Sequence, residues 1–101
     1  MNILDKVHKL LTGEKREDYG EAKEFSQTVT EYWTTYIAHK YNLPDDFRLH
    51  PEDFPQMMLL FKIAREQNKH KPDNIVDQIG YGGVTAMVYG EYNDEPTSDK
   101  G

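Results

Sequence analysis

The spacing of apolar residues along the chain predicts two helices in its first half. In residues 2–12 the apolar side chains recur on one helical face, at Ile3, Val7, Leu10 and Leu11. A longer helix is expected over residues 20–41, where the apolar stripe consists of Phe25, Val29, Trp33, Tyr36 and Ile37. The β-branched run TVTEYWTTYI in this segment is also compatible with a strand, but its length and its three-to-four spacing favour a helix.

A third helix is expected to begin inside the proline-rich segment YNLPDDFRLHPEDFP and to run to about Gln67. Its start has two interpretations. Either His50 caps it with Pro51 at the first helical position, or Asp53 caps it and Gln56 closes a capping box.

The fourth predicted helix begins with Asp73 as its cap and continues to about Tyr89. It contains three interior glycines, each costing up to about 1 kcal/mol relative to alanine, at Gly80, Gly82 and Gly83. Such a cluster indicates that another backbone approaches closely. We therefore expect an all-α, four-helix bundle-like domain over residues 1–90, followed by a disordered acidic tail at 91–101.

The apolar run MMLLFKIAR, residues 57–65, is typical of a buried helix but contains Lys62. Lysine is rarely buried alone, so its ammonium group either extends to solvent along its stem or meets an anion. Arg65 follows one turn later, and Asp77 is flanked by apolar residues on the next helix. If these helices pack antiparallel, Lys62 and Arg65 are expected to face Asp77 across a polar cleft.

Two acidic pairs are candidate metal ligands. Asp73 and Asp77, four residues apart, share one helix face. Glu21 and Glu24 form an E-x-x-E pair that, with an aspartate from a facing helix, could hold Mg²⁺. E-x-x-E is also common on solvated helix surfaces, where it has no ligand.

Two tyrosines are candidates for contacts with a nucleotide base. Tyr81 continues the face of Asp77 by one further turn. Asp18 and Tyr19 precede Gly20 and are compatible with a helix cap. They are equally compatible with a tyrosine ring and a carboxylate at the mouth of the cleft, where they could stack on and hydrogen-bond a base.

Composition narrows the function classes. Cysteine is absent, which excludes disulfides and thiol catalysis. The net charge of −6 makes the chain a poor general binder of duplex DNA, whereas the basic segment 62–71 suits a small anion. The sequence also lacks the roughly 20 consecutive apolar residues of a membrane span and the apolar stretch of a secretory signal. We therefore expect a cytoplasmic protein that does not bind membranes.

Self-association is expected as well. The GYGG stretch of the fourth helix offers a face where two helices can approach closely, extended by Val84, Met87 and Val88. A chain of 101 residues gains core by pairing. A homo-oligomer is therefore predicted.

Four motifs together resemble a family of small bacteriophage proteins, similar to nucleotide-modification-associated helical domains. They are E-D-Y-G at 17–20, the aromatic helix with Trp33, M-x-L-L-x-K-I-A-R at 57–65 and D-x-x-x-D-x-x-G-Y at 73–81. The resemblance covers roughly residues 14–86. Its most specific part is K-I-A-R followed by D-x-x-x-D-x-x-G-Y.

More distantly, the helical layout is similar to the MazG-like and dimeric dUTPase group of all-α nucleoside triphosphate pyrophosphatases. That group holds Mg²⁺ against a nucleotide's phosphates with E-x-x-E on one helix and E-x-x-D on the next. Asp73 and Asp77 match the second motif at a spacing of four instead of three. On the preceding helix, Lys62 and Arg65 stand where the group has acids.

The favoured hypothesis is a phage-encoded nucleotide-binding protein in the cytoplasm of the infected host, where it could sequester a signalling nucleotide of host defence. Lys62 and Arg65 would bind phosphate directly, with Asp77 orienting them and no cofactor required. The base or ribose would lie among Asp18, Tyr19 and Tyr81. Because this site lacks a metal-bound water, binding is favoured over hydrolysis.

Two alternatives remain open. One is a Mg²⁺-dependent nucleoside triphosphate pyrophosphohydrolase whose metal ligands are Glu21, Glu24, Asp73 and Asp77. The other is a host-takeover adaptor that binds a bacterial protein, in which the polar cluster is purely structural.

Overall fold

The computed structural model describes residues 2–13 and 21–92. These residues form four helices and no strand: α1 (Ile3–Thr12), α3 (Ala22–Tyr41), α4 (Asp53–Asn68) and α5 (Pro72–Val88). The predicted all-α class and the predicted number of helices are confirmed for this part of the chain. Asp18, Tyr19 and nearly all of the predicted acidic tail lie outside the described residues.

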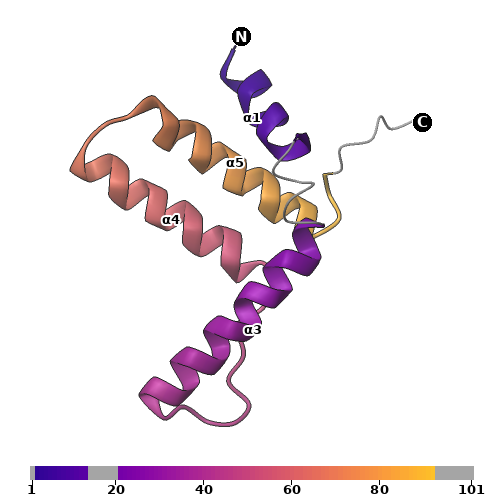
Figure 1. The fold of residues 1–101 in the computed structure, drawn as a ribbon, viewed down its shortest axis with the longest axis vertical. Helices are drawn as coiled ribbons and strands as arrows, with labels where there is room; N and C mark the ends of the chain where they lie inside the picture. Colours follow the sequence, from indigo (N-terminus) through magenta and orange to yellow (C-terminus); the bar gives the residue numbers. More distant parts are fainter. Residues whose placement is uncertain (1, 14–20, 93–101) are drawn as a thin grey trace.

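Helix α5 lies between α1 and α4, and α3 crosses the end of the α4–α5 pair (Figure 1). A connection of only three residues, 69–71, joins α4 to α5, so the two helices pack antiparallel. The second half of α3 extends beyond the other three helices, and residues 42–50 return alongside it. The radius of gyration is accordingly 15.4 Å, compared with about 13 Å for a compact domain of 100 residues.

Neither residue predicted to cap α4 occupies the cap position, which belongs to Glu52 and has no side-chain hydrogen bond. The helix begins at Asp53, after a turn whose Asp53 backbone N–H donates to the carbonyl of His50 at 2.8 Å. The Asp53 carboxylate in turn accepts the backbone N–H of His50 at 2.8 Å. This reciprocal pair resembles a capping box, because the carboxylate of Asp53 reaches back to the backbone N–H of His50, three residues earlier. The loop is thereby fixed where it enters α4.

The predicted cap of α5 is wrong by two residues. Lys71 occupies the cap position without a side-chain hydrogen bond, and Pro72 is the first helical residue. Proline suits that position because its φ angle is already helical and it has no N–H to leave unpaired. Asp73 therefore lies inside the first turn, where the helix dipole favours a negative charge.

The buried face of α3 consists of small hydroxyl residues, Ser26, Thr30 and Thr34. The Thr30 hydroxyl donates to the carbonyl of Ser26 at 2.9 Å, and the Thr34 hydroxyl accepts the backbone N–H of Leu49 at 2.9 Å. Most of the predicted apolar stripe flanks this face and is half-buried. Tyr36 is an exception, because its side chain is 63% exposed although Trp33 and Ile37 in the same half of α3 are half-buried.

Helix α1 packs against the glycines of α5. A Cβ atom built on Gly83 would lie 2.5 Å from Cδ1 of Leu11, whereas Gly80 and Gly82 have nothing within 4 Å of that position. The predicted approach of another backbone to the glycine cluster is therefore wrong among the described residues: only the side chain of Leu11 comes close, and only at Gly83. Val88, expected on a self-association face, is buried within the chain instead.

Candidate functional site

The structure brings Lys62 and Asp77 together across the α4–α5 interface. The Lys62 ammonium lies 2.9 Å from Oδ2 of Asp77. The Lys62 side chain is 16% exposed and the Asp77 side chain 32% exposed, so solvent reaches both charges. The antiparallel packing of the two helices places the residues at the same height, as the sequence predicts. The anion beside Lys62 is thus supplied by the chain itself.

Arg65 lies one turn beyond Lys62 on α4 and is exposed. It makes no ion pair within the described part of the chain. The Lys62 ammonium lies 5.9 Å from the centroid of the Phe61 ring, within range of a cation–π contact. Because Asp77 neutralises Lys62, the net positive charge on this side of α4 is contributed by Arg65.

Tyr81 lies one turn beyond Asp77 on α5, at the edge of an aromatic cluster. Its ring meets Phe54 edge-on, with the two centroids 6.2 Å apart. Phe54 also contacts Phe25 and Trp33 edge-on, at 5.6 and 5.8 Å. The cluster joins α3, α4 and α5, and it fixes the position of Tyr81 relative to the ion pair. A tyrosine held in this way presents a rigid ring and a hydroxyl group one turn from a carboxylate.

The four acids proposed as metal ligands do not gather into one site. Among the described residues, no group of three or more histidine or acidic side chains could hold a metal ion. Glu21 and Glu24 lie at the start of α3, beside the C-terminal end of α5. Asp73 lies at the opposite end of α5, about 20 Å away at 1.5 Å per residue. The two acidic pairs of the hydrolase alternative are therefore not brought together in the part of the chain that the structure describes.

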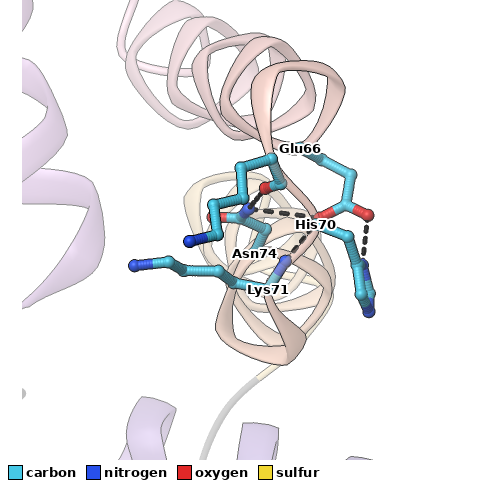
Figure 2. Close-up of polar contacts among 5 residues, drawn as sticks. Glu66, His70, Lys71 and Asn74 are labelled. Carbon is cyan, nitrogen blue, oxygen red and sulfur yellow. Dashed lines mark hydrogen bonds and ion pairs between the residues drawn. The ribbon is translucent and has the colours of Figure 1, made fainter.

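A polar network that the sequence analysis did not identify connects α4 to α5 (Figure 2). The Glu66 carboxylate accepts hydrogen bonds from the ring N–H of His70, the backbone N–H of Lys71 at 3.2 Å and the side-chain amide of Asn74 at 3.1 Å. Asn74 is buried and also donates to the carbonyl of Lys69 at 3.3 Å. The four-residue spacing of Glu66 and His70 was the available signal for this contact.

The network changes the acidity of its central carboxyl group. The hydrogen bond from His70 is the main reason that the pKa of Glu66 is lowered from its ordinary value, and the bonds from Asn74 and Lys71 act in the same direction. Desolvation opposes them. Together these hydrogen bonds hold in place the turn at residues 69–71, which joins α4 to α5. The network therefore fixes the relative position of α4 and α5, on which the Lys62–Asp77 pair depends.

A groove lies along the second half of α3. The groove has a volume of about 630 Å³ and is lined by Glu31, Thr34, Thr35, Ala38, His39, Asn42, Leu43, Pro44, Asp45, Arg48 and Leu49. The Arg48 guanidinium donates to the carbonyls of Asp45 and Phe47, at 3.0 and 2.7 Å. These bonds use the arginine to hold its own loop. The groove therefore lies between α3 and the loop that returns alongside it, and it is separate from the candidate site on α4 and α5.

A family model described as "Domain of unknown function (DUF6378)" matches residues 2–89 of the chain. The Gene 55 protein of Mycobacterium phage L5 is 35% identical over 85 residues, which are 83% of this chain and 50% of that protein. The Gene 55 protein of Mycobacterium phage D29 is 25% identical over 91 residues, 89% of this chain and 55% of that protein. The chain thus spans about half the length of the curated relatives it matches. No solved structure matches it.

The match covers all four helices and both members of the Lys62–Asp77 pair. In the part of the chain that the structure describes, none of the helices has the length and hydropathy needed to cross a bilayer.

Proposed function

The chain belongs to the family described as a domain of unknown function (DUF6378), with phage proteins among its relatives, and for this member we propose a nucleotide-binding function. Lys62 and Arg65 contact the phosphates, Asp77 orients the Lys62 ammonium, and Tyr81 lies next to the base or ribose. The protein would act in the cytoplasm of the infected host. The single observation that supports the proposal most is the partly exposed Lys62–Asp77 pair, with Arg65 one turn away and without an ion pair among the described residues.

The charges of these residues suit a phosphate. The Lys62–Asp77 pair is neutral as a whole, so an approaching anion meets Arg65 as a net positive charge and Lys62 as a second donor. Lysine has three N–H donors, and Asp77 uses one of them, so the remaining donors can turn towards a phosphate. Arginine adds a planar fork that binds phosphate with two hydrogen bonds. Such a site needs no metal ion.

The resemblance of the motifs to nucleotide-modification-associated and MazG-like domains supports a nucleotide as the anion. In this chain the helix that precedes Asp73 and Asp77 carries Lys62 and Arg65 in place of acids. The two cations can replace Mg²⁺ in neutralising phosphate charge, but they supply no metal-bound water. The proposal is therefore binding without hydrolysis, and sequestration of a signalling nucleotide is one use of such a site.

Isothermal titration calorimetry against a nucleotide panel tests the proposal. The panel contains nucleoside mono- and triphosphates and cyclic mono- and dinucleotides, each with and without Mg²⁺. Arg65→Ala removes a charged hydrogen bond worth about 1.5–3 kcal/mol, so we expect about 10- to 100-fold weaker binding. Lys62→Ala is expected to weaken binding to a similar degree. The affinity of the unaltered chain should not require Mg²⁺.

Lys40→Ala is the matched control, because it removes an exposed cation from α3 without touching α4 or α5. It should leave affinity unchanged. Binding that survives both Lys62→Ala and Arg65→Ala, or no binding across the panel, contradicts the proposal. Release of pyrophosphate from a triphosphate in the presence of Mg²⁺, abolished in Asp77→Asn, would instead indicate a pyrophosphohydrolase.

A second candidate function, an adaptor that binds a bacterial protein, is favoured by the surface of α3. Its second half extends from the molecule and exposes Tyr32, Tyr36 and Tyr41. Tyrosines are enriched at protein interfaces, where a large rigid ring and a hydroxyl act together. The test is capture from host lysate with Tyr32→Ser/Tyr36→Ser as the comparison. A stoichiometric partner lost only in this variant would support the adaptor function, whereas equal capture would contradict it.

A further inference from the structure

Helix α4 has a second apolar face that no other part of the described chain covers. On its inner side Pro55 is buried, Phe54 contacts α3 and α5, and Lys62 pairs with Asp77 of α5. On the opposite side, Leu60 is 62% exposed, Phe61 50% and Met57 40%. Ala64 continues this face and is exposed as well. We call Met57, Leu60, Phe61 and Ala64 the outer stripe of α4.

Because of the outer stripe, the sequence of α4 is apolar on nearly all sides. Such a sequence predicts a helix with neighbours all round. Among the described residues, α4 has neighbours on one side only. A contiguous apolar patch of a few hundred Å² on a protein surface often marks an interaction site. The outer stripe is therefore a candidate interaction surface.

We propose that the outer stripe is the interface of a symmetric dimer, in which α4 packs antiparallel against α4 of a second copy. A twofold axis near Leu60 and Phe61 places Met57 of one copy opposite Ala64 of the other, so a large side chain faces a small one. The stripe is thus complementary to itself, as a twofold interface requires.

The charges at the ends of α4 favour the antiparallel orientation. Glu52 and Asp53 stand at its N-terminal end, whereas at its C-terminal end the cations Arg65 and Lys69 outnumber the single acid Glu66. In an antiparallel pair, the acidic end of each helix lies beside the basic end of the other, and the two helix dipoles also oppose each other. A parallel pair would place like charges together. The charge pattern is therefore complementary to that of a second, antiparallel copy of this chain, and this favours a second copy as the occupant of the stripe.

The size of the stripe sets the expected strength. The exposed parts of its three large side chains amount to roughly 300 Å² per copy. A standard interface buries about 800 Å² per partner. The flanks of α4 must therefore contribute, and we expect a reversible dimer with a dissociation constant of about 1–100 µM.

Sedimentation velocity over about 1–300 µM protein tests this proposal. The unaltered chain should shift from monomer to dimer in this range, and Leu60→Lys should weaken the dimer at least about tenfold. Leu4→Lys is the control, because Leu4 is equally exposed but lies on α1. It should dimerise like the unaltered chain. A chain that stays monomeric at about 300 µM, or a dimer of unchanged affinity in Leu60→Lys, overturns the proposal. Circular dichroism checks that both variants fold.

The orientation has its own test, because the chain contains no cysteine. Under oxidising conditions, Phe61→Cys, near the proposed axis, should crosslink to itself. Ala64→Cys should not crosslink to itself but should crosslink to Met57→Cys when the two variants are mixed. Self-crosslinking of Ala64→Cys without the mixed product would show a parallel pair and overturn the antiparallel arrangement.

Discussion

Removing the Lys62–Asp77 ion pair is expected to destabilise the fold measurably even without a ligand. Exposed pairs contribute about 0–1 kcal/mol, whereas breaking a fully buried pair costs about 3–5 kcal/mol. With side chains 16% and 32% exposed, this pair lies between these limits. We therefore expect Asp77→Asn to lower the free energy of unfolding by about 1–2 kcal/mol, which corresponds to a melting temperature lower by roughly 5–15 °C.

A double-mutant cycle isolates the contribution of the pair itself. Lys62→Met keeps most of the apolar stem and removes the charge, and Asp77→Asn keeps the shape of the side chain. The free energy of unfolding of both single variants and of the double variant is measured by urea denaturation followed by circular dichroism. We expect a coupling energy of about 1 kcal/mol. A coupling energy within about 0.3 kcal/mol of zero would show that the two charges are independent, and would refute this account of why Lys62 is tolerated in α4.

Three further predictions concern stability. Gly82→Ala should stabilise the chain by up to about 1 kcal/mol in thermal unfolding, because the position is open, whereas Gly83→Ala should gain less because its methyl group must displace Leu11. Ser26→Ala should be neutral or stabilising by up to about 1 kcal/mol in the same assay, because the buried hydroxyl has no partner among the described residues. Glu66→Gln should be less stable than the unaltered chain near neutral pH. Because the pKa of Glu66 is lowered in the fold, this difference should disappear as the pH falls below the ordinary carboxyl range.

Most of the fold could be predicted from local pattern. Apolar spacing identified the four helices, and the short connection between α4 and α5 implied the antiparallel packing that pairs Lys62 with Asp77. The start of α5 was misjudged because aspartate is a common cap, yet proline at the preceding position had the stronger claim. Tyr36 was misplaced because the buried face of α3 is formed by the small hydroxyl residues Ser26, Thr30 and Thr34, which an apolar pattern does not identify.

The features missed in the candidate site depend on contacts between elements. The Glu66 network requires the geometry of the turn at 69–71, which brings Asn74 back to a carboxylate eight residues earlier. The four proposed metal ligands share plausible motifs, but motifs do not fix which helix ends meet: Glu21 and Glu24 lie at the start of α3, whereas Asp73 and Asp77 lie in the first part of α5. Similarly, no local pattern shows which side of an apolar helix is left uncovered, so the outer stripe of α4 becomes visible only in the fold.

The central claim is that an anionic nucleotide binds beside Lys62, and the most direct measurement is a nucleotide titration followed by ¹H–¹⁵N correlation spectra of the labelled chain. The account predicts that the backbone amide resonances of Lys62, Arg65 and Asp77 and the side-chain Nε–H resonance of Arg65 shift first and saturate together, with smaller shifts at the backbone amide of Tyr81. Shifts confined to α3 and its loop, or no saturable shift at α4 and α5 with any nucleotide of the panel, would contradict it.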